Sequence, residues 1–89
     1  MARFLVLTTF SSAEARIAHR AEHRVYLKQL VDAGSLLMAG PFADERGGVM
    51  ILEAEDEAEV LRLLADDPFT INGVFATTEV RPWVLVAGS

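Results

Sequence analysis

The chain has no cysteine, no basic excess and no apolar run long enough to cross a membrane. Without cysteine it forms no disulfide, has no thiolate nucleophile and builds no cysteine-based metal site, which fits a reducing cytoplasm. The formal net charge of −5, with no run of lysine or arginine, argues against nucleic-acid binding. We therefore expect a cytoplasmic protein with neither nucleic acid nor a membrane among its partners.

Linkers, repeats and low-complexity segments are also missing, so we expect residues 1–89 to form a single domain. Hydrophobic residues make up 52% of the chain, which excludes a disordered protein. A domain this small leaves much of its surface exposed, so association with a second copy is expected. Residues 1–15 only loosely resemble a secretory signal, because Thr8 and Thr9 interrupt the apolar run, and we expect this segment to be retained as a strand.

The hydrophobic pattern predicts strands and helices in alternation. The expected strands are 2–10, 35–42, 49–54 and 74–86, and the expected helices are about 13–33 and 57–67. Ser11 or Ser12 caps the first helix, which Gly34 ends, and Asp56 caps the second. Pro68 begins a short turn at 68–73, and Pro82 puts part of the last strand at a sheet edge or bulge.

The resulting order, βαββαβ, predicts an α+β fold of the ferredoxin-like type. In this fold a four-stranded antiparallel sheet carries two helices on one face. The other face stays open and fairly apolar, and a second copy stacking sheet to sheet would cover it. We therefore predict a homodimer formed through the open sheet face.

Residues 19–23, HRAEH, match the H-x-x-E-H pattern of one class of zinc peptidase. Such a site needs a third protein ligand, usually a distant glutamate, and no glutamate here stands in a recognisable ligand context. Peptidases with this pattern are also far larger than this chain. We therefore expect no metal site, and we interpret the match as a coincidence of helix composition.

Helix geometry separates the two histidines of this stretch. At 100° per residue one helix face carries Arg20, His23, Leu27, Leu30 and Val31. His19 lies at the border of that face and is expected to be a bystander. Arg16 shares the face with Arg20, and arginines are costly to bury without an acidic partner or an anionic ligand, so this polar cluster indicates a cleft.

An acidic partner for His23 would come from Asp67 or its neighbour Asp66. By residue type Asp67 is a cap for the turn at 68–73. Alternatively, Asp67 orients His23 and raises its basicity, as a carboxylate does for a catalytic imidazole. The residues alone leave both interpretations open.

Several segments together resemble the YCII-related (YciI-like) domain family, and the resemblance covers nearly the whole chain. They are Arg20-x-x-His23-x-x-x-Leu27-x-x-Leu30, Gly34, Leu37-x-Ala39-Gly40-Pro41, Asp67-Pro68-Phe69 with Gly73, and Val80-Arg81-Pro82-Trp83. The resemblance implies a ferredoxin-like fold that dimerises in the manner of the dimeric α/β barrel proteins. It also implies an active-site pair, here His23 and Asp67, and His19 does not belong to the pattern.

Related dimeric-barrel proteins include lactone isomerases, dehalogenating lyases and monooxygenases acting on small, often aromatic, metabolites. The leading hypothesis is therefore a cofactor-free enzyme of lyase or isomerase type, with His23 as general base or acid and Asp67 fixing its tautomer. Arg20 would bind an anionic group of the substrate. The expected lining of the cleft is Gly40, Pro41 and Phe69. The alternatives are a non-catalytic dimer that binds a small ligand or serves as an accessory module, and a purely structural link between the two helices.

Overall fold

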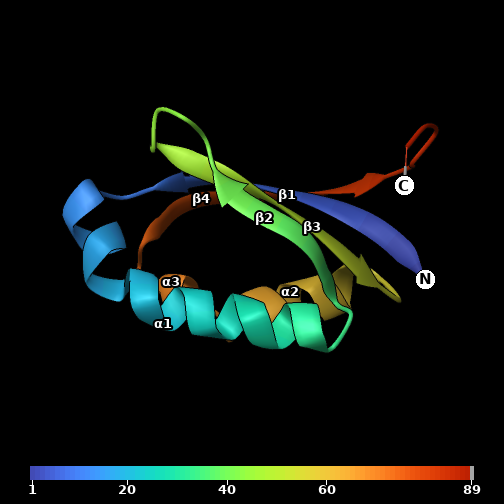
Figure 1. The fold of residues 1–89 in the computed structure, drawn as a ribbon, viewed down its shortest axis with the longest axis horizontal. Helices are drawn as coiled ribbons and strands as arrows, with labels where there is room; N and C mark the ends of the chain where they lie inside the picture. The colour runs from blue at the N-terminus through green and yellow to red at the C-terminus, as the bar shows by residue number, and fades with distance from the viewer. Residues whose placement is uncertain (89) are drawn as a thin grey trace.

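The computed structural model describes residues 1–88, in which helices cover one face of a four-stranded antiparallel sheet (Figure 1). The elements are β1 (Ala2–Phe10), α1 (Ala13–Asp32), β2 (Leu36–Pro41), β3 (Gly47–Ala54), α2 (Glu57–Ala65), α3 (Pro68–Ile71) and β4 (Phe75–Trp83). The strands lie in the order β2-β3-β1-β4, with every neighbouring pair antiparallel. This arrangement confirms the predicted ferredoxin-like α+β fold.

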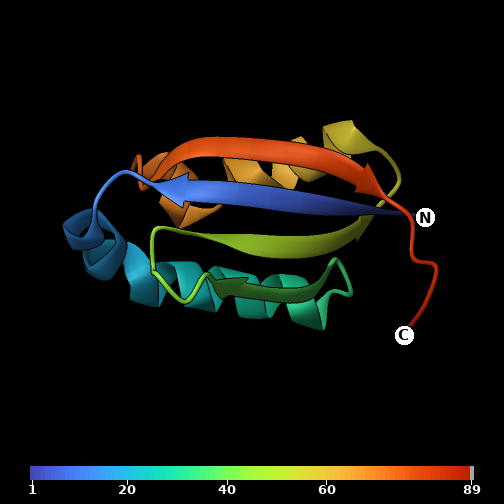
Figure 2. The same cartoon turned by 90° about the horizontal axis from the view of Figure 1, so that it is seen from above.

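The helices divide the covered face of the sheet between them. Figure 2 shows α1 beneath the β2 side of the sheet and α2 and α3 beneath the β4 side. Ser12 caps α1 by accepting a hydrogen bond from the Ala15 N–H, as predicted. Gly34, at a φ of 80°, turns the chain out of the helix towards β2. No helix among residues 1–88 has the length and apolar character needed to span a bilayer.

The core lies between the sheet and the helices, and strand alternation builds it. Phe4 and Val6 of β1 pair with Leu52 and Met50 of β3, so all four side chains point to the helix side. Leu30 of α1 packs into the same cluster. Val31, predicted on that helix face, is 50% exposed, and the prediction was wrong because a residue next to Leu30 is rotated about 100° from it around the helix axis.

The other face of the sheet is open and carries an apolar centre. Leu5 pairs with Ile51 and Leu7 with Val49, and each of these side chains is partly exposed. Trp83 is 39% exposed at the end of β4. The structure therefore leaves uncovered the apolar face that the sequence predicts.

Three predicted boundaries were wrong by a few residues: the start of β3, the end of β4 and the end of the second helix. Strand β3 begins at Gly47 rather than at residue 49, because the two glycines of the expected loop pair with Thr9 and Thr8 of β1. Strand β4 ends at Trp83 rather than at 86, because its pairing with β1 ends opposite Arg3. Pro82 is tolerated because β4 lies at the edge of the sheet.

The second helix, predicted over 57–67, ends at Ala65 because residue 67 precedes a proline. Asp67 has a φ of −68° and a ψ of 128°, an extended conformation outside the helical region. Pro68 then takes the first position of α3, so the expected turn at 68–73 contains one helical turn. The break between α2 and α3 places Asp67 beside α1.

Candidate functional site

A cavity of about 250 Å³ lies between α1 and the end of the sheet. Its wall combines arginine and histidine residues from α1 with phenylalanines from β1, α3 and β4 and with small and apolar residues from β2 and β3. The polar residues therefore come from one helix face, while the surfaces opposite are mostly apolar. Such a mixture of apolar walls and a few convergent polar groups is typical of a small-molecule site.

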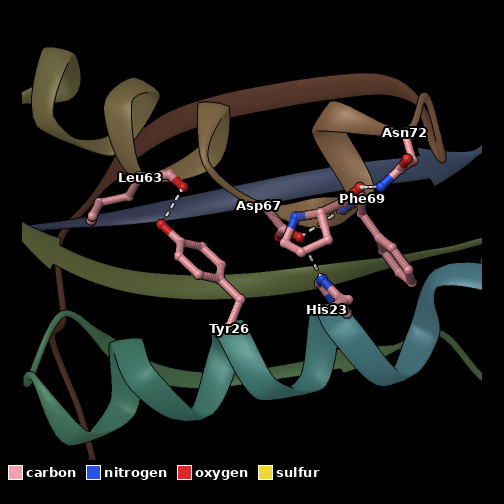
Figure 3. Close-up of polar contacts among 7 residues, drawn as sticks. His23, Tyr26, Leu63, Asp67, Phe69 and Asn72 are labelled. Carbon is pink, nitrogen blue, oxygen red and sulfur yellow. Dashed lines mark hydrogen bonds and ion pairs between the residues drawn. The ribbon is translucent and has the colours of Figure 1, made fainter.

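His23 and Asp67 meet at this cavity. The His23 Nδ1 lies 2.8 Å from the Asp67 Oδ1, and the side chains are 13% and 1% exposed (Figure 3). Since an ionised carboxylate only accepts hydrogen bonds, Nδ1 carries the proton in this pair and donates it. That tautomer leaves Nε2 as the nitrogen able to accept a proton from a ligand, and His23 itself lines the cavity.

The same oxygen of Asp67 also caps α3. The backbone N–H of Phe69 donates to Asp67 Oδ1 over 2.9 Å, so two donors converge on one buried atom. The sequence left open whether Asp67 is a cap or a histidine partner, and the structure shows both contacts at once. Asp66, the other acidic candidate, is exposed at the end of α2.

Aromatic rings fix the plane of the His23 imidazole. The imidazole stacks on the Phe69 ring with centroids 3.7 Å apart and planes inclined by 2° (Figure 3). The Phe75 ring meets the imidazole edge-on, with centroids 6.1 Å apart. A protonated imidazole over an aromatic face is a favourable cation–π arrangement. The hydrogen bond to Asp67 and the stacked ring therefore hold the imidazole in one orientation at the cavity wall.

Tyr26, one turn after His23 on α1, ties the same helix to α2. Its hydroxyl donates to the Leu63 carbonyl oxygen over 2.8 Å (Figure 3). Burial is the main cause that raises the pKa of Tyr26, and the negative charges of Asp66 and Asp67 raise it further. The tyrosine therefore stays neutral and holds α1 beside the segment that carries Asp67.

Strands β2 and β3 come unusually close where they form the cavity wall. A Cβ atom on Gly48 would lie 2.7 Å from the Gly40 carbonyl oxygen and 3.1 Å from the Pro41 Cα. Only a residue without a side chain fits there unless the backbone moves. By contrast, a Cβ on Gly40 would meet nothing within 4 Å.

The residues predicted as a site come together in one place. Arg20, Gly40, Pro41 and Phe69 all line the cavity with His23, and Asp67 lies behind the imidazole. Their roles in binding or catalysis remain predictions. His19 is outside the cavity lining, with its Nδ1 buried and 3.6 Å from Glu22. Among residues 1–88 no three histidine, cysteine or acidic side chains gather as metal ligands would.

Sequence reasoning missed part of the cavity wall. Phe10 and Phe75 were not predicted, although they pair across the ends of β1 and β4 and stack at 6.2 Å. An aromatic residue at the end of each strand was the available signal. Arg16 was recognised as costly to bury but was not assigned to the site, and the structure places it in the cavity wall at 8% exposure.

Comparison with known proteins gives three informative matches. The YCII-related domain family matches residues 2–84. The uncharacterized protein YjpA of Bacillus subtilis is 31% identical over 80 residues, covering 90% of this chain and 93% of YjpA. The xenovulene A biosynthesis cluster protein asL2 of Sarocladium schorii is 32% identical over 81 residues, covering 78% of this chain and 70% of asL2.

Solved structures show the same fold. TftG from Burkholderia phenoliruptrix AC1100, a 5-chloro-2-hydroxyhydroquinone dehydrochlorinase in complex with 2,5-dihydroxybenzoquinone, superposes with a TM-score of 0.80 at 31% identity. The match covers 92% of this chain and 93% of that chain. An antibiotic biosynthesis monooxygenase gives a TM-score of 0.63 at 20% identity over 98% of this chain and 100% of its own, a likeness of fold alone.

Proposed function

The chain belongs to the YCII-related domain family, and we propose that it is a small-molecule enzyme that uses His23 for general acid–base proton transfer. The observation that carries the proposal is the bond between His23 Nδ1 and the buried Asp67 carboxylate, at 2.8 Å, in the wall of a cavity. A histidine held by a carboxylate on one nitrogen and facing a cavity is the arrangement that proton transfer requires.

In the first step the neutral His23 accepts a proton from the substrate at Nε2. The imidazolium formed is stabilised by the Asp67 carboxylate, which keeps accepting from Nδ1, and by the Phe69 ring stacked on it. His23 then returns the proton to another atom of the substrate, as in an isomerase, or to a leaving group or water, as in a lyase. Acid–base help of this kind contributes about 10²–10⁴-fold in rate.

The size and lining of the cavity favour a substrate with one ring. Its volume of about 250 Å³ lies just below the roughly 300–1,000 Å³ typical of sites for drug-sized ligands. The phenylalanine rings at positions 10, 69 and 75 give it apolar walls, and the arginines of α1, Arg20 among them, stand at the same cavity to bind a negative oxygen. TftG acts on a chlorinated hydroxyhydroquinone, and a hydroxylated or halogenated single ring is the substrate class we propose here.

The proposal is tested by assaying turnover of chlorinated and hydroxylated hydroquinones by the purified chain, with loss of substrate followed spectrophotometrically. We expect His23→Ala to keep its fold by circular dichroism and to lose turnover by about 10²-fold or more. His19→Ala is the matched control, because it removes a histidine from the same helix but outside the cavity. Full activity in His23→Ala would refute the mechanism, and binding without turnover in the wild type would favour a ligand-binding module.

We also propose that two copies associate through the open sheet face. The support is the uncovered apolar centre formed by Leu5, Leu7, Val49 and Ile51, with Met38 beside it at 58% exposure. Apolar patches of this kind on a small domain mark interaction surfaces. A clean monomer at micromolar concentration in equilibrium sedimentation would contradict the dimer.

A further inference from the structure

Arg16 is a buried cation in the cavity wall, on the same face of α1 as His23. It is 8% exposed, and its guanidinium carbon lies 5.2 Å from the centroid of the Phe10 ring. A guanidinium is always charged and has five N–H donors, so its burial calls for an anionic partner with several acceptor sites. A cation–π contact with Phe10 satisfies none of those donors.

The acidic contact of Arg16 within residues 1–88 is incomplete. Its Nη1 lies 3.7 Å from the Oε1 of Glu45, beyond the roughly 2.7–2.9 Å of a charge-assisted hydrogen bond. The Glu45 side chain is also 70% exposed, so water weakens the attraction. The guanidinium therefore keeps N–H donors for a ligand in the cavity, which Arg16 lines.

The loop between β2 and β3 holds Glu45 at this place. The Glu45 N–H donates to the Phe42 carbonyl oxygen over 2.9 Å, and the Phe10 N–H donates to the Arg46 carbonyl oxygen over 2.8 Å. The first bond closes the turn within the loop, and the second fastens the loop to the end of β1, beside the Phe10 ring that Arg16 covers. Glu45 has a φ of 61°, a left-handed conformation that a residue with a side chain seldom adopts.

We propose that Arg16 anchors a negatively charged group of the ligand, and that the Glu45 carboxylate takes this place in the free protein and moves aside on binding. The inference rests on the proposed function in assigning the ligand to the same cavity. It adds the position of the charge: Arg16 and His23 are seven residues apart on α1, two turns or about 10 Å. A chain of ring contacts links the two residues: Arg16 covers the Phe10 ring, the Phe10 ring meets the Phe69 ring edge-on at 5.9 Å, and the Phe69 ring stacks on His23.

This spacing defines the ligand class as a planar ring compound with one negative group. The charge binds Arg16, the ring lies along the phenylalanines, and the reacting atom at the opposite end of the ring faces His23. Arg20, which lies between the two on the same helix face, then contacts the middle of the ligand rather than its charged end.

The test compares benzoate, a planar anion, with benzamide, its neutral counterpart, as probes in NMR titrations of the full chain. We expect Glu45→Gln to increase benzoate affinity about two- to fivefold, because the competing charge is gone, and to leave benzamide affinity unchanged. Asp44→Asn is the matched control, because it removes a charge from the same loop. The amide oxygen of asparagine can still accept the hydrogen bond from the Arg46 N–H that Asp44 accepts over 3.0 Å. We expect this control to bind both probes as the wild type does.

Arg16→Met should bind benzoate at least about tenfold more weakly and should abolish the gain from Glu45→Gln when the two changes are combined. Circular dichroism checks that this variant folds. If it does not, the comparison of Glu45→Gln with Asp44→Asn decides the question alone. His23→Ala is expected to keep benzoate binding, so the anchor can be confirmed even if the proton-transfer mechanism fails.

Three results would overturn the proposal. One is an equal gain, or none, in Glu45→Gln and Asp44→Asn. The second is loss of benzoate binding in Arg20→Met but not in Arg16→Met, which would make Arg20 the anchor. The third is no difference between benzoate and benzamide in any variant, which would show that the cavity does not select for negative charge.

Discussion

Replacing Asp67 with alanine and, separately, with asparagine should have very different effects on stability. Its Oδ1 accepts from His23 Nδ1 at 2.8 Å and from the Phe69 N–H at 2.9 Å, and the residue is 1% exposed. Alanine removes the acceptor, which costs about 1 kcal/mol for the lost cap and about 1–3 kcal/mol for donors left without a partner. We expect Asp67→Ala to lower the free energy of unfolding by about 2–4 kcal/mol.

Asparagine keeps an amide oxygen with two acceptor sites where Oδ1 lies, so both donors retain a partner. The change removes the negative charge and little else, and we expect a loss of less than about 1.5 kcal/mol. The charge is what supports the His23 imidazolium, so the same variant should lose turnover by about 10²-fold while remaining folded. Stability and activity would thus separate at one side chain.

The measurement is urea unfolding followed by circular dichroism, at one protein concentration because an associating protein gains stability with concentration. Asp66→Ala is the control, since it removes the adjacent acidic side chain, which is exposed, and should change stability little. Equal destabilisation by asparagine and alanine would show that charge, and not a shared acceptor, stabilises the pair. An alanine variant as stable as the wild type would refute the whole account of Asp67.

Three further predictions test other parts of the molecule. Tyr26 is the sole tyrosine of the chain, so tyrosinate absorbance should show a pKa above the ordinary value of about 10. The contribution of Tyr26 to stability is complete below pH 10 and falls as the pH rises through the folded pKa. The variant Tyr26→Phe should lack this loss of stability at alkaline pH. A midpoint at or below the ordinary value would contradict the burial. Gly48→Ala should cost about 1–3 kcal/mol in urea unfolding because its Cβ meets backbone, whereas Gly40→Ala should be neutral; equal effects would refute the close approach of β2 and β3. Ile51→Lys should give a folded monomer in equilibrium sedimentation and Thr70→Lys, on the helix side, should not; a dimer that survives Ile51→Lys would place the interface elsewhere.

Much of the fold could be predicted because local signals agree with one another. The observed bounds of β1 match the prediction, and α1 differs by one residue at its end, where a cap and a glycine mark the termini. The element order then selects the ferredoxin-like topology. The boundaries that failed depend on pairing between strands: Gly47 and Gly48 belong to β3 because of residues in β1, which no local pattern reveals.

The site residues likewise fall into two groups: those that local sequence patterns identify, and those whose partners only the tertiary structure reveals. Helix periodicity identifies His23 as facing the sheet, and the cost of burying arginine singles out Arg16 and Arg20. The partners of these residues come from distant segments, Asp67 from 44 residues along the chain and Glu45 from a loop, so periodicity cannot name them. Residue chemistry gave Asp67 two alternative partners, and only the structure shows one oxygen making both contacts.

The Asp67-Pro68-Phe69 segment explains why the break between α2 and α3 lies beside His23. Pro68 forces Asp67 out of the helical conformation, so α2 stops and the carboxylate is free to reach α1. The extended Asp67 then caps α3, and the cap fixes the oxygen that accepts from His23. The residue after the proline supplies the ring on which the imidazole stacks. Each of the three residues therefore constrains His23 by a different physical means: Asp67 by a hydrogen bond, Phe69 by ring stacking, and Pro68 by the backbone conformation that it imposes on Asp67. A substitution at Pro68 should therefore disturb His23 indirectly, through Asp67.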